Sequence, residues 1–187
     1  MVLDLDETLI HYIDFDQNHN DPSRLKKNPA NHDGGLTSRT DLTKNEDEYG
    51  GHFLIRPGAR DFLAKMAAQY ELVIFTAAMQ DYADWVLDIL DSENLISHRL
   101  YRQHAIRDGP VFVKDLATLG RDLRKTVIVD NVAQNFKRQQ ANGIHIKSWF
   151  DDPQDTALPE LGTLLELIAI KKYEDIRDGL REVMGGL

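Results

Sequence analysis

The chain has 187 residues, enough for one domain with a substantial apolar core, and 42% hydrophobic with 28% charged residues is an ordinary globular composition. No apolar run approaches the roughly 20 residues needed to cross a bilayer, so we predict no membrane contact from this segment. With 22 basic and 31 acidic residues, the formal charge of −9 argues against a general attraction to nucleic acid. Any phosphate-bearing partner must therefore be held by a local site.

The absence of cysteine excludes disulfides, thiolate nucleophiles and cysteine-bound zinc or iron–sulfur sites. It agrees with a reducing compartment, and we predict an intracellular location, nuclear or cytoplasmic. The histidines are scattered and show no zinc-protease spacing. Met1 leads directly into an apolar run with no visible signal peptide, so we hypothesise that an upstream segment, which could carry targeting or membrane signals, has been removed.

Residues 1–10, MVLDLDETLI, form an apolar run that predicts a buried strand, but Asp4, Asp6 and Glu7 interrupt it. Burying carboxylates without a cation or hydrogen-bond donors is unfavourable, so these side chains are expected to bind something. Residues 13–52 follow as a long polar excursion with few apolar anchors. We predict a partly mobile segment containing a hairpin, which could act as a flap or lid.

Periodic elements resume after the excursion. Residues 52–55 predict a short strand, and a helix follows with Pro57 in its first turn. The apolar face of that helix carries Phe62, Leu63, Met66 and Ala67. Residues 71–75 predict a buried strand, and residues 80–92 an amphipathic helix. The apolar positions of this second helix are Tyr82, Trp85, Val86, Ile89 and Leu90, which the helical period assigns to the core rather than to a stacking platform.

Short strands and two helices complete the chain. Residues 98–104 and 111–115 predict two strands around a turn at 107–110, and residues 125–130 and 143–150 predict two more. Two helical stripes follow from about residue 155, formed by Leu158, Leu161, Leu164, Leu165 and Ile168, then by Ile176, Leu180 and Val183. A solvated helix face is the interpretation of the basic residues Arg121, Arg124, Lys125, Lys137 and Arg138.

Apolar strands that alternate with helices indicate an α/β fold, with a central, mainly parallel sheet and helices on both faces. Ligands of such sheets bind at the carboxyl ends of the strands. Three predicted strands end there in polar residues, which are Asp4 with Asp6, Thr76, and Asp130 with Asn131. Asp4 and Asp6 share one site if the strand persists, and divide their roles if the chain turns after Asp4.

Crowded carboxylates repel one another unless a hard cation lies among them. Oxygen ligands from Asp4, from a backbone carbonyl near Asp6 and from Asn131 suit Mg²⁺, which commonly takes a phosphate oxygen as a further ligand. The sequence therefore predicts a magnesium and phosphate site at this edge of the sheet.

Six blocks occur in order along nearly the whole chain: DLDETLI, RPGARDFL, VIFTAAMQDYAD, VKDLATLGRDL, VIVDN and SWFDDPQDTAL. Together they resemble the Fcp/Scp-like, or NLI-interacting-factor-like, protein phosphatases of the haloacid-dehalogenase superfamily. The first block matches the DxDxT/V signature of that superfamily. The resemblance implies one domain over residues 1–187 with a three-layer Rossmann-like fold and small cap or insert elements. It also implies Mg²⁺-dependent hydrolysis of phosphoserine or phosphothreonine in proteins, with the RNA polymerase II C-terminal domain as one compatible substrate.

Carried over to this sequence, the resemblance implies that Asp4 is the nucleophile of a phosphoaspartyl intermediate and Asp6 the general acid and base. Thr76 would donate its hydroxyl to a phosphoryl oxygen, and Lys114 would offset charge on the phosphoryl group and Asp4. The implied magnesium ligands are Asp4, Asp6 and Asn131, with Asp130 acting behind them or through water. The implied substrate-binding residues are Thr8, Ala77 and Arg102.

Each of these residues also has a purely structural interpretation. Asp4 and Asp6 could cap strand ends, and Lys114 could be a solvated surface lysine. Thr76 could pack within a strand, and Arg102 could be an ordinary surface charge. The order of the six blocks favours catalytic roles for the first four residues. For Arg102 both interpretations stay open.

Two other functions stay open as alternatives. The same fold serves, without catalysis, as a receptor subunit of the mitochondrial presequence translocase, but members of that branch often lose the catalytic carboxylates that are present here. A small-metabolite phosphatase would keep the chemistry, although the segment between Thr76 and Lys114 is too short for a large cap domain. Residues 102–112 lack an aromatic cluster for gripping proline, so a preference for proline-directed phosphosites does not follow.

Overall fold

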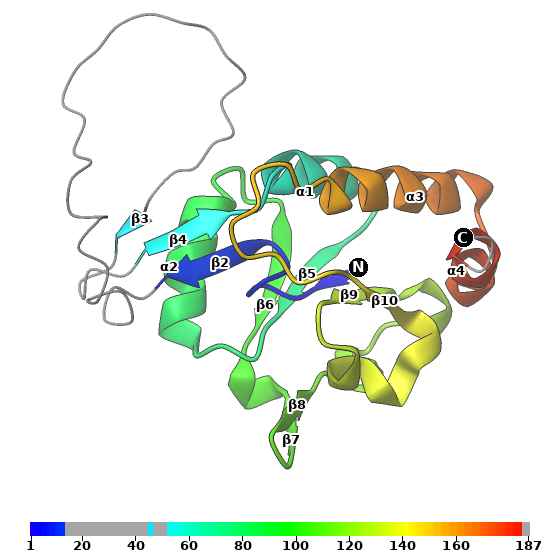
Figure 1. Cartoon of the computed structure of the whole chain (residues 1–187). Helices are drawn as coiled ribbons and strands as arrows, with labels where there is room; N and C mark the ends of the chain where they lie inside the picture. The colour runs from blue at the N-terminus through cyan, green and yellow to red at the C-terminus, as the bar shows by residue number, and fades with distance from the viewer. Residues whose placement is uncertain (14–44, 47–51, 185–187) are drawn as a thin grey trace, which may run out of the picture.

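A five-stranded parallel sheet forms the centre of the computed structural model of the chain (Figure 1). Its strand order is β10–β9–β1–β5–β6, and every neighbouring pair is parallel. The strands are Val2–Leu3 (β1), Leu72–Phe75 (β5), Ile96–Leu100 (β6), Ile128–Asp130 (β9) and Gly143–His145 (β10). The parallel α/β sheet predicted from the sequence is confirmed.

The structure describes residues 1–13, 45–46 and 52–184. Most of the polar excursion at 13–52, including its expected flap or lid, lies outside the described residues. The assignment of residues 1–187 to one domain therefore stays a prediction. None of the helices in the described part of the chain is both long and apolar enough to span a bilayer.

Successive residues of the central strands face opposite sides of the sheet. Leu3 and Ile74 pack into one buried cluster, whereas Val2 and Phe75 pack into another on the opposite face. The first cluster is covered by α1 (Ala59–Ala67), α2 (Gln80–Leu90), α3 (Ala157–Lys171) and α4 (Ile176–Met184). The second is covered by the 3₁₀ helices η4 (Leu116–Leu119), η5 (Leu123–Lys125) and η6 (Ala133–Asn142). Helices therefore lie on both faces, as predicted.

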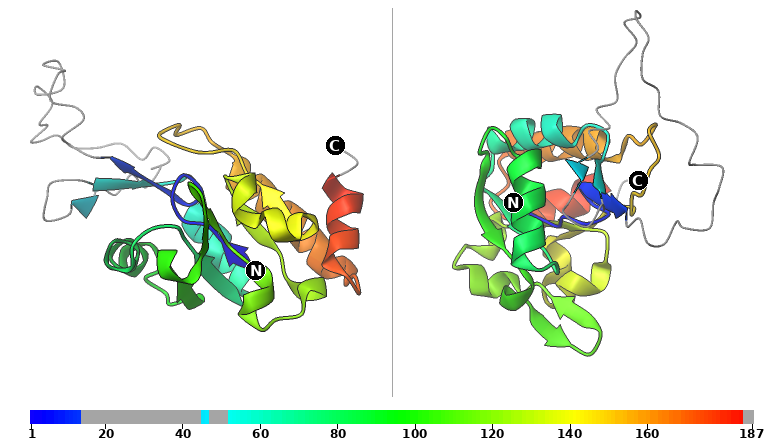
Figure 2. Two further views of the ribbon diagram at one scale, coloured as in Figure 1. Left: turned by 90° about the horizontal axis from the view of Figure 1, so that it is seen from below. Right: turned by 90° about the vertical axis from the view of Figure 1, so that its left-hand side faces the viewer.

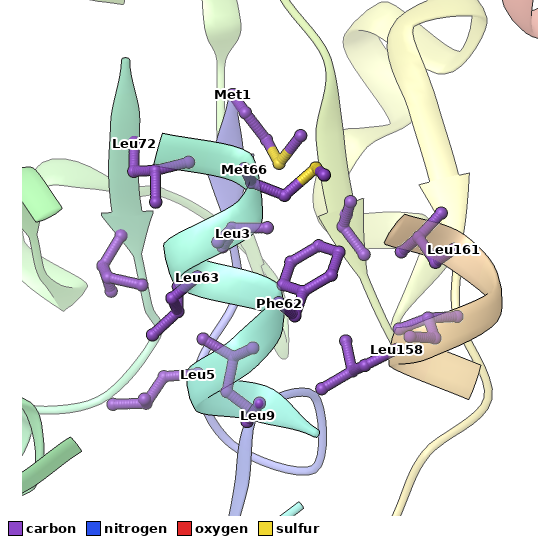
Figure 3. Close-up of a cluster of buried hydrophobic side chains, with 14 of the residues drawn as sticks. Met1, Leu3, Leu5, Leu9, Phe62, Leu63, Met66, Leu72, Leu158 and Leu161 are labelled. Atoms are coloured by element: carbon purple, nitrogen blue, oxygen red, sulfur yellow. The ribbon is translucent and has the colours of Figure 1, made fainter. Parts of the chain in front are cut away.

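Helix α1 packs between β1 and α3 (Figure 3). Its buried face carries Phe62, Leu63 and Met66, as the period of the sequence predicted. The placement of Pro57 in the first helical turn is wrong, because α1 begins only at Ala59. The residue between them, Gly58, has a φ of 74°, a left-handed conformation that cannot continue into a helix.

The predicted apolar stripes of α3 and α4 are confirmed, because Leu158, Leu165, Ile168 and Leu180 are buried. The fully buried face of α2 consists of Ala83, Val86, Leu87 and Leu90, while its aromatic residues are only partly buried. The basic residues at 121–125 and 137–138 are exposed as expected, but they lie on or beside 3₁₀ helices.

A second, antiparallel sheet holds the two ends of the polar excursion. Strand β4 (His52–Ile55) pairs with β2 (Ile10–Ile13) and with β3 (Asn45–Glu46). The predicted strand at 52–55 is therefore confirmed, whereas the hairpin expected within residues 13–52 falls mostly outside the described residues. Because β2 follows the first central strand closely, this small sheet stands beside the carboxyl ends of the central strands.

Two strands were predicted at 98–104 and 111–115, and both are present in part, but they do not pair with each other. Strand β6 ends at Leu100 within the central sheet, and the partner of β8 (Val111–Val113) is β7 (Ile106–Asp108). The segment between β6 and β7, η3 (Arg102–His104), is a 3₁₀ turn. The Tyr101 amide donates to Nδ1 of His104 instead of bonding to a neighbouring strand. The β7–β8 hairpin projects from the body of the molecule (Figure 1 and Figure 2).

Replacing Phe62 by alanine should lower the free energy of unfolding by about 3–5 kcal/mol, because the ring is buried between β1 and α3 and its loss leaves a cavity. Urea denaturation monitored by circular dichroism measures this loss. The matched control is Ile170→Ala on α3, whose side chain is 71% exposed, and its effect should stay within about 0.5 kcal/mol. Equal effects of the two substitutions would contradict the packing described here.

Candidate active site

A cleft of about 490 Å³ opens at the carboxyl ends of β1, β5 and β9. Its lining includes Asp4, Asp6, Thr76, Ala77, Arg102 and Asn131, all of which the sequence predicted as site residues. A larger cavity of about 940 Å³ lies beside Met1, Glu71 and Thr126, near the opposite ends of the same strands, and contains none of them. The chemistry of the lining, rather than the volume, identifies the smaller cleft as the candidate active site.

The chain turns sharply after β1. The amides of Leu9 and Ile10 both donate to the carbonyl of Leu5, at 2.9 and 3.2 Å, and Glu7 has a φ of 55°. The predicted strand over residues 1–10 is therefore wrong beyond Leu3. Of the two arrangements left open by the sequence, the turn is the one observed, so Asp4 and Asp6 leave the strand end in different surroundings. Residues 4–10, which contain the predicted nucleophile Asp4, are called the nucleophile turn below.

Lys114 joins two carboxylates inside the protein. Its Nζ lies 2.5 Å from Oδ1 of Asp4 and 2.6 Å from Oδ2 of Asp130, and its side chain has no exposed surface. Asp130 also accepts hydrogen bonds from the Val132 amide at 2.8 Å and from the Asn135 side chain. The interpretation of Lys114 as a solvated surface lysine is therefore wrong.

Burial alone would lower the pKa of Lys114, but the charges of Asp4 and Asp130 and their hydrogen bonds raise it above its usual value. Lys114 therefore stays protonated. Burial, followed by the charge of Asp4, raises the pKa of Asp130, and Lys114 opposes this shift. When both carboxylates are ionised, the two carboxylates and the one ammonium leave a net negative charge at the base of the cleft.

Asp6 binds different partners. The hydroxyl of Tyr82 donates to its Oδ1 at 2.7 Å, and the hydroxyl of Thr76 approaches its Oδ2 at 3.4 Å. Burial raises the pKa of Asp6 to about 6, the charges of Asp4 and Glu7 add to the shift, and the hydrogen bond from Tyr82 opposes it. A carboxyl group with this pKa can both give and take a proton near neutral pH.

Tyr82 is a site residue that the sequence analysis missed, since it was assigned to the core by helical spacing. It does pack partly against the core, but its hydroxyl reaches into the cleft. The signal that could have found it is its place in the first turn of α2, directly after the strand that ends at the site.

Thr76 and Arg102 flank the same cleft. The Thr76 hydroxyl oxygen accepts the Ala78 amide at 3.0 Å, so its lone pair is oriented by the backbone. Arg102 Nε donates to the carbonyl of Ala77 at 2.5 Å, and its guanidinium lies 5.0 Å from the ring centre of Phe112. Arg102 is exposed, but these two contacts hold its side chain at the rim of the cleft.

Thr8 takes another position than expected. Its side chain is fully buried and donates to Oδ2 of Asp4 at 3.0 Å, behind the surface of the cleft. The Thr8 side chain does not line the cleft, and the assignment of Thr8 as a substrate-binding residue stays a prediction. The Thr8 hydroxyl orients the carboxylate of Asp4.

The donor set fits a small, hard cation. Asn131 lines the cleft, and its amide nitrogen donates to Oγ of Ser148 at 3.0 Å. The amide oxygen of Asn131 therefore points away from Ser148. The side chain of Asp6 is engaged with Tyr82 and Thr76, so its backbone carbonyl is the better candidate ligand. Within the described ranges no group of three or more His, Cys, Asp or Glu residues could hold a metal. One carboxylate, one amide and one carbonyl, completed by water and phosphate, are typical of magnesium rather than zinc.

Comparison with known proteins gives concordant results. The sequence model of the NLI interacting factor-like phosphatase family matches residues 1–177. CTD small phosphatase-like protein 3 of Caenorhabditis elegans is 40% identical over 182 residues, which cover 97% of this chain and 58% of that protein. A CTD nuclear envelope phosphatase 1 homolog of Drosophila melanogaster is 38% identical over 182 residues, covering 96% of this chain and 70% of that protein.

The solved structure of Fcp1, an essential RNA polymerase II CTD phosphatase, has the same fold, with a TM-score of 0.66 at 18% identity over 92% of this chain and 62% of that one. The chain spans only 58% and 52% of the length of two of its curated relatives, from Caenorhabditis elegans and Dictyostelium discoideum. The match nevertheless runs through all six sequence blocks. The chain belongs to the NLI interacting factor-like phosphatase family of the haloacid-dehalogenase superfamily.

Proposed function

We propose that this chain is a Mg²⁺-dependent protein phosphatase that hydrolyses phosphoserine and phosphothreonine through an aspartyl phosphate on Asp4. The observation that carries the proposal is the carboxylate of Asp4 at the cleft, held by Lys114 at 2.5 Å and by Thr8 at 3.0 Å. A nucleophile fixed on two sides loses little conformational freedom when it attacks. Asp6 lies close enough for its charge to act on the same site.

In the first step, an oxygen of Asp4 attacks phosphorus while the bond from phosphorus to the serine or threonine oxygen breaks. Asp6 gives its proton to that leaving oxygen. In the second step, Asp6 takes a proton from water, whose oxygen attacks phosphorus and releases inorganic phosphate and the Asp4 carboxylate. The pKa of Asp6 near 6 supports both transfers, and the Lys114 ammonium offsets the charge that develops.

Magnesium would be held by Asp4, the carbonyl of Asp6 and Asn131, and it supplies positive charge that neutralises phosphoryl oxygens. Neighbouring residues of the chain hold the side chains of this site in place. Ser148 orients the amide of Asn131, and Asn135 with Val132 orients Asp130 behind the site. Thr76 supports the phosphoryl group through its hydroxyl, which also touches Asp6.

The substrate class is inferred from the rim and from the relatives. Arg102 lies at the opening of the cleft, where its guanidinium can bind a phosphate or a peptide carbonyl. Relatives are named CTD small phosphatases, and one solved neighbour is an RNA polymerase II CTD phosphatase. These names support a phosphoprotein substrate, with the polymerase tail as a candidate. One relative is named for the nuclear envelope, and this name supports a nuclear location.

Asp4→Asn and Asp6→Asn should each lower the turnover of an aryl phosphate in the presence of Mg²⁺ by at least about 10³-fold, because one removes the nucleophile and the other the proton carrier. Chelation of Mg²⁺ by EDTA should abolish wild-type turnover reversibly. Asp91→Asn is the matched control, since Asp91 is a buried carboxylate that caps the far end of α2. Full activity in either site variant would reject the proposal, and presequence-peptide binding without turnover would favour the receptor alternative.

Arg102→Ala should raise KM for phosphoserine peptides about tenfold or more while the turnover of a small aryl phosphate changes little, because the guanidinium contacts the peptide beyond the reacting group. The control is Arg107→Ala, which removes an exposed arginine of β7 whose Nε donates to the Gly109 carbonyl and which does not line the cleft in the described part of the chain. An equal loss for both kinds of substrate would assign Arg102 to the phosphoryl site instead. A preference for small metabolites over peptides would overturn the proposed substrate class.

Asp6→Asn should stabilise the protein in EDTA at pH 7.5 and leave its stability unchanged near pH 4. The folded-state pKa of about 6 lies above the ordinary 3.8, so burial of the charge destabilises the folded state increasingly as pH rises from about 4 to 6. The full shift corresponds to about 3 kcal/mol as an upper limit. Urea denaturation across this pH range measures the difference. A gain in stability that does not depend on pH would contradict the assigned pKa.

A further inference from the structure

Arg56 is a buried arginine outside the candidate active site. It follows β4, is 1% exposed, and does not line the cleft in the described part of the chain. Its Nε and Nη2 donate to the two carboxylate oxygens of Asp155 at 2.7 and 2.9 Å. The pair joins two sequence blocks, RPGARDFL and SWFDDPQDTAL, whose presence the proposed chemistry does not explain.

A buried ion pair is seldom more stabilising than an apolar replacement, so the presence of this pair suggests a specific role. Burial alone would raise the pKa of Asp155, but the hydrogen bonds and charge of Arg56 lower it below its usual value, which favours an ionised pair. The remaining nitrogen, Nη1 of Arg56, donates to the carbonyl of Thr8 at 3.1 Å. One guanidinium therefore ties the loop before α3 to the nucleophile turn.

The backbone of Arg56 contacts the same turn. Its amide donates to the carbonyl of Leu9 at 3.0 Å, so two consecutive carbonyls of the nucleophile turn are held by one residue. Thr8 in turn donates its hydroxyl to Oδ2 of Asp4 at 3.0 Å. Asp155 is thus linked to the carboxylate of Asp4 through Arg56 and Thr8, whose backbone carbonyl binds Arg56 and whose hydroxyl binds Asp4.

The loop of residues 146–156, which runs between β10 and α3 (Figure 1), contacts the turn at a second point. The amide of Trp149 donates to the carbonyl of Glu7 at 2.8 Å, and the Trp149 indole donates to the carbonyl of Asp152 within the loop. The Trp149 side chain is buried. The turn is therefore fastened from the loop at Glu7 and, through Arg56, at Thr8.

We propose that Arg56 and Asp155 are positioning residues for Asp4, which act by fixing the nucleophile turn so that Thr8 holds the attacking carboxylate. This inference rests on the proposed function of Asp4 but concerns residues that touch neither substrate nor metal ligands directly. Reaction rates are sensitive to such placement, since an error of about 1 Å in a reacting group can lower the rate about 10²-fold. The planar fork of arginine suits the role, because it meets Asp155 with two nitrogens and Thr8 with a third.

Asp155→Asn and Arg56→Lys test the proposal. Asparagine keeps the shape but removes the charge, and lysine keeps the charge but cannot reach both partners. Each variant should lower kcat for an aryl phosphate about tenfold or more, with KM within about twofold, at temperatures where the protein stays folded. Asp91→Asn is the matched control, because it removes another buried carboxylate that accepts two backbone amides far from the cleft. It should lower stability without changing kcat.

A double-mutant cycle with Thr8→Val separates positioning from general destabilisation. If Arg56 and Asp155 act through Thr8, the loss in kcat of the Asp155→Asn, Thr8→Val double variant should be clearly smaller than the product of the two single losses. Losses that multiply, or an unchanged kcat in stable Asp155→Asn and Arg56→Lys variants, would overturn the proposal.

Hydrogen exchange by NMR tests the same idea without activity. The amides of Leu9 and Ile10, which close the nucleophile turn onto Leu5, should exchange about tenfold faster or more in Asp155→Asn but not in Asp91→Asn. Unchanged protection in Asp155→Asn would overturn the positioning role. An inactive wild type with the expected exchange pattern would instead reject only the proposed function, so the two failures are distinguishable.

Discussion

The structure of the site depends on one buried ammonium group. Two strands, β1 and β9, end in aspartates at the same edge of the sheet, and their carboxylates would repel one another strongly in a buried setting. Lys114 arrives from the separate segment after β8 and bonds both of them. Its own amide donates to the carbonyl of Asn135 at 2.7 Å, which anchors that segment against η6. The remaining negative charge makes the cleft suitable for a cation and a phosphoryl group together.

The two aspartates of the first block are chemically different because the chain turns between them. Asp4 meets a lysine and a threonine hydroxyl, while Asp6 meets a tyrosine and stays in an environment that raises its pKa. A pair of carboxylates in unlike environments suits a division into nucleophile and proton carrier. The same turn must be held rigidly, and its carbonyls are bonded by Arg56 and Trp149 rather than by regular secondary structure.

Sequence patterns predicted the parallel sheet, the buried faces of α1 and α3, and the convergence of Asp4, Thr76 and Asn131 on one cleft. These predictions depend on period and strand order, which are local or follow from general rules of α/β sheets. The errors occur where a side chain competes with regular backbone bonding or where the backbone adopts a non-helical conformation. After Leu100, the His104 side chain accepts the Tyr101 amide, and the strand ends there. Gly58 has a left-handed conformation, so α1 begins at Ala59 and does not include Pro57.

The sequence by itself determined the fold class, the family and the identities of the polar residues at the strand ends, because spacing and block order are encoded along the chain. Only the tertiary structure decided that Thr8 lies behind Asp4, that Tyr82 reaches Asp6, and that Arg56 pairs with Asp155. The physical reason is distance along the chain. Arg56 and Asp155 are 99 residues apart, and they meet only because several elements pack together. A local sequence pattern does not indicate which hydrogen bonds form through that packing.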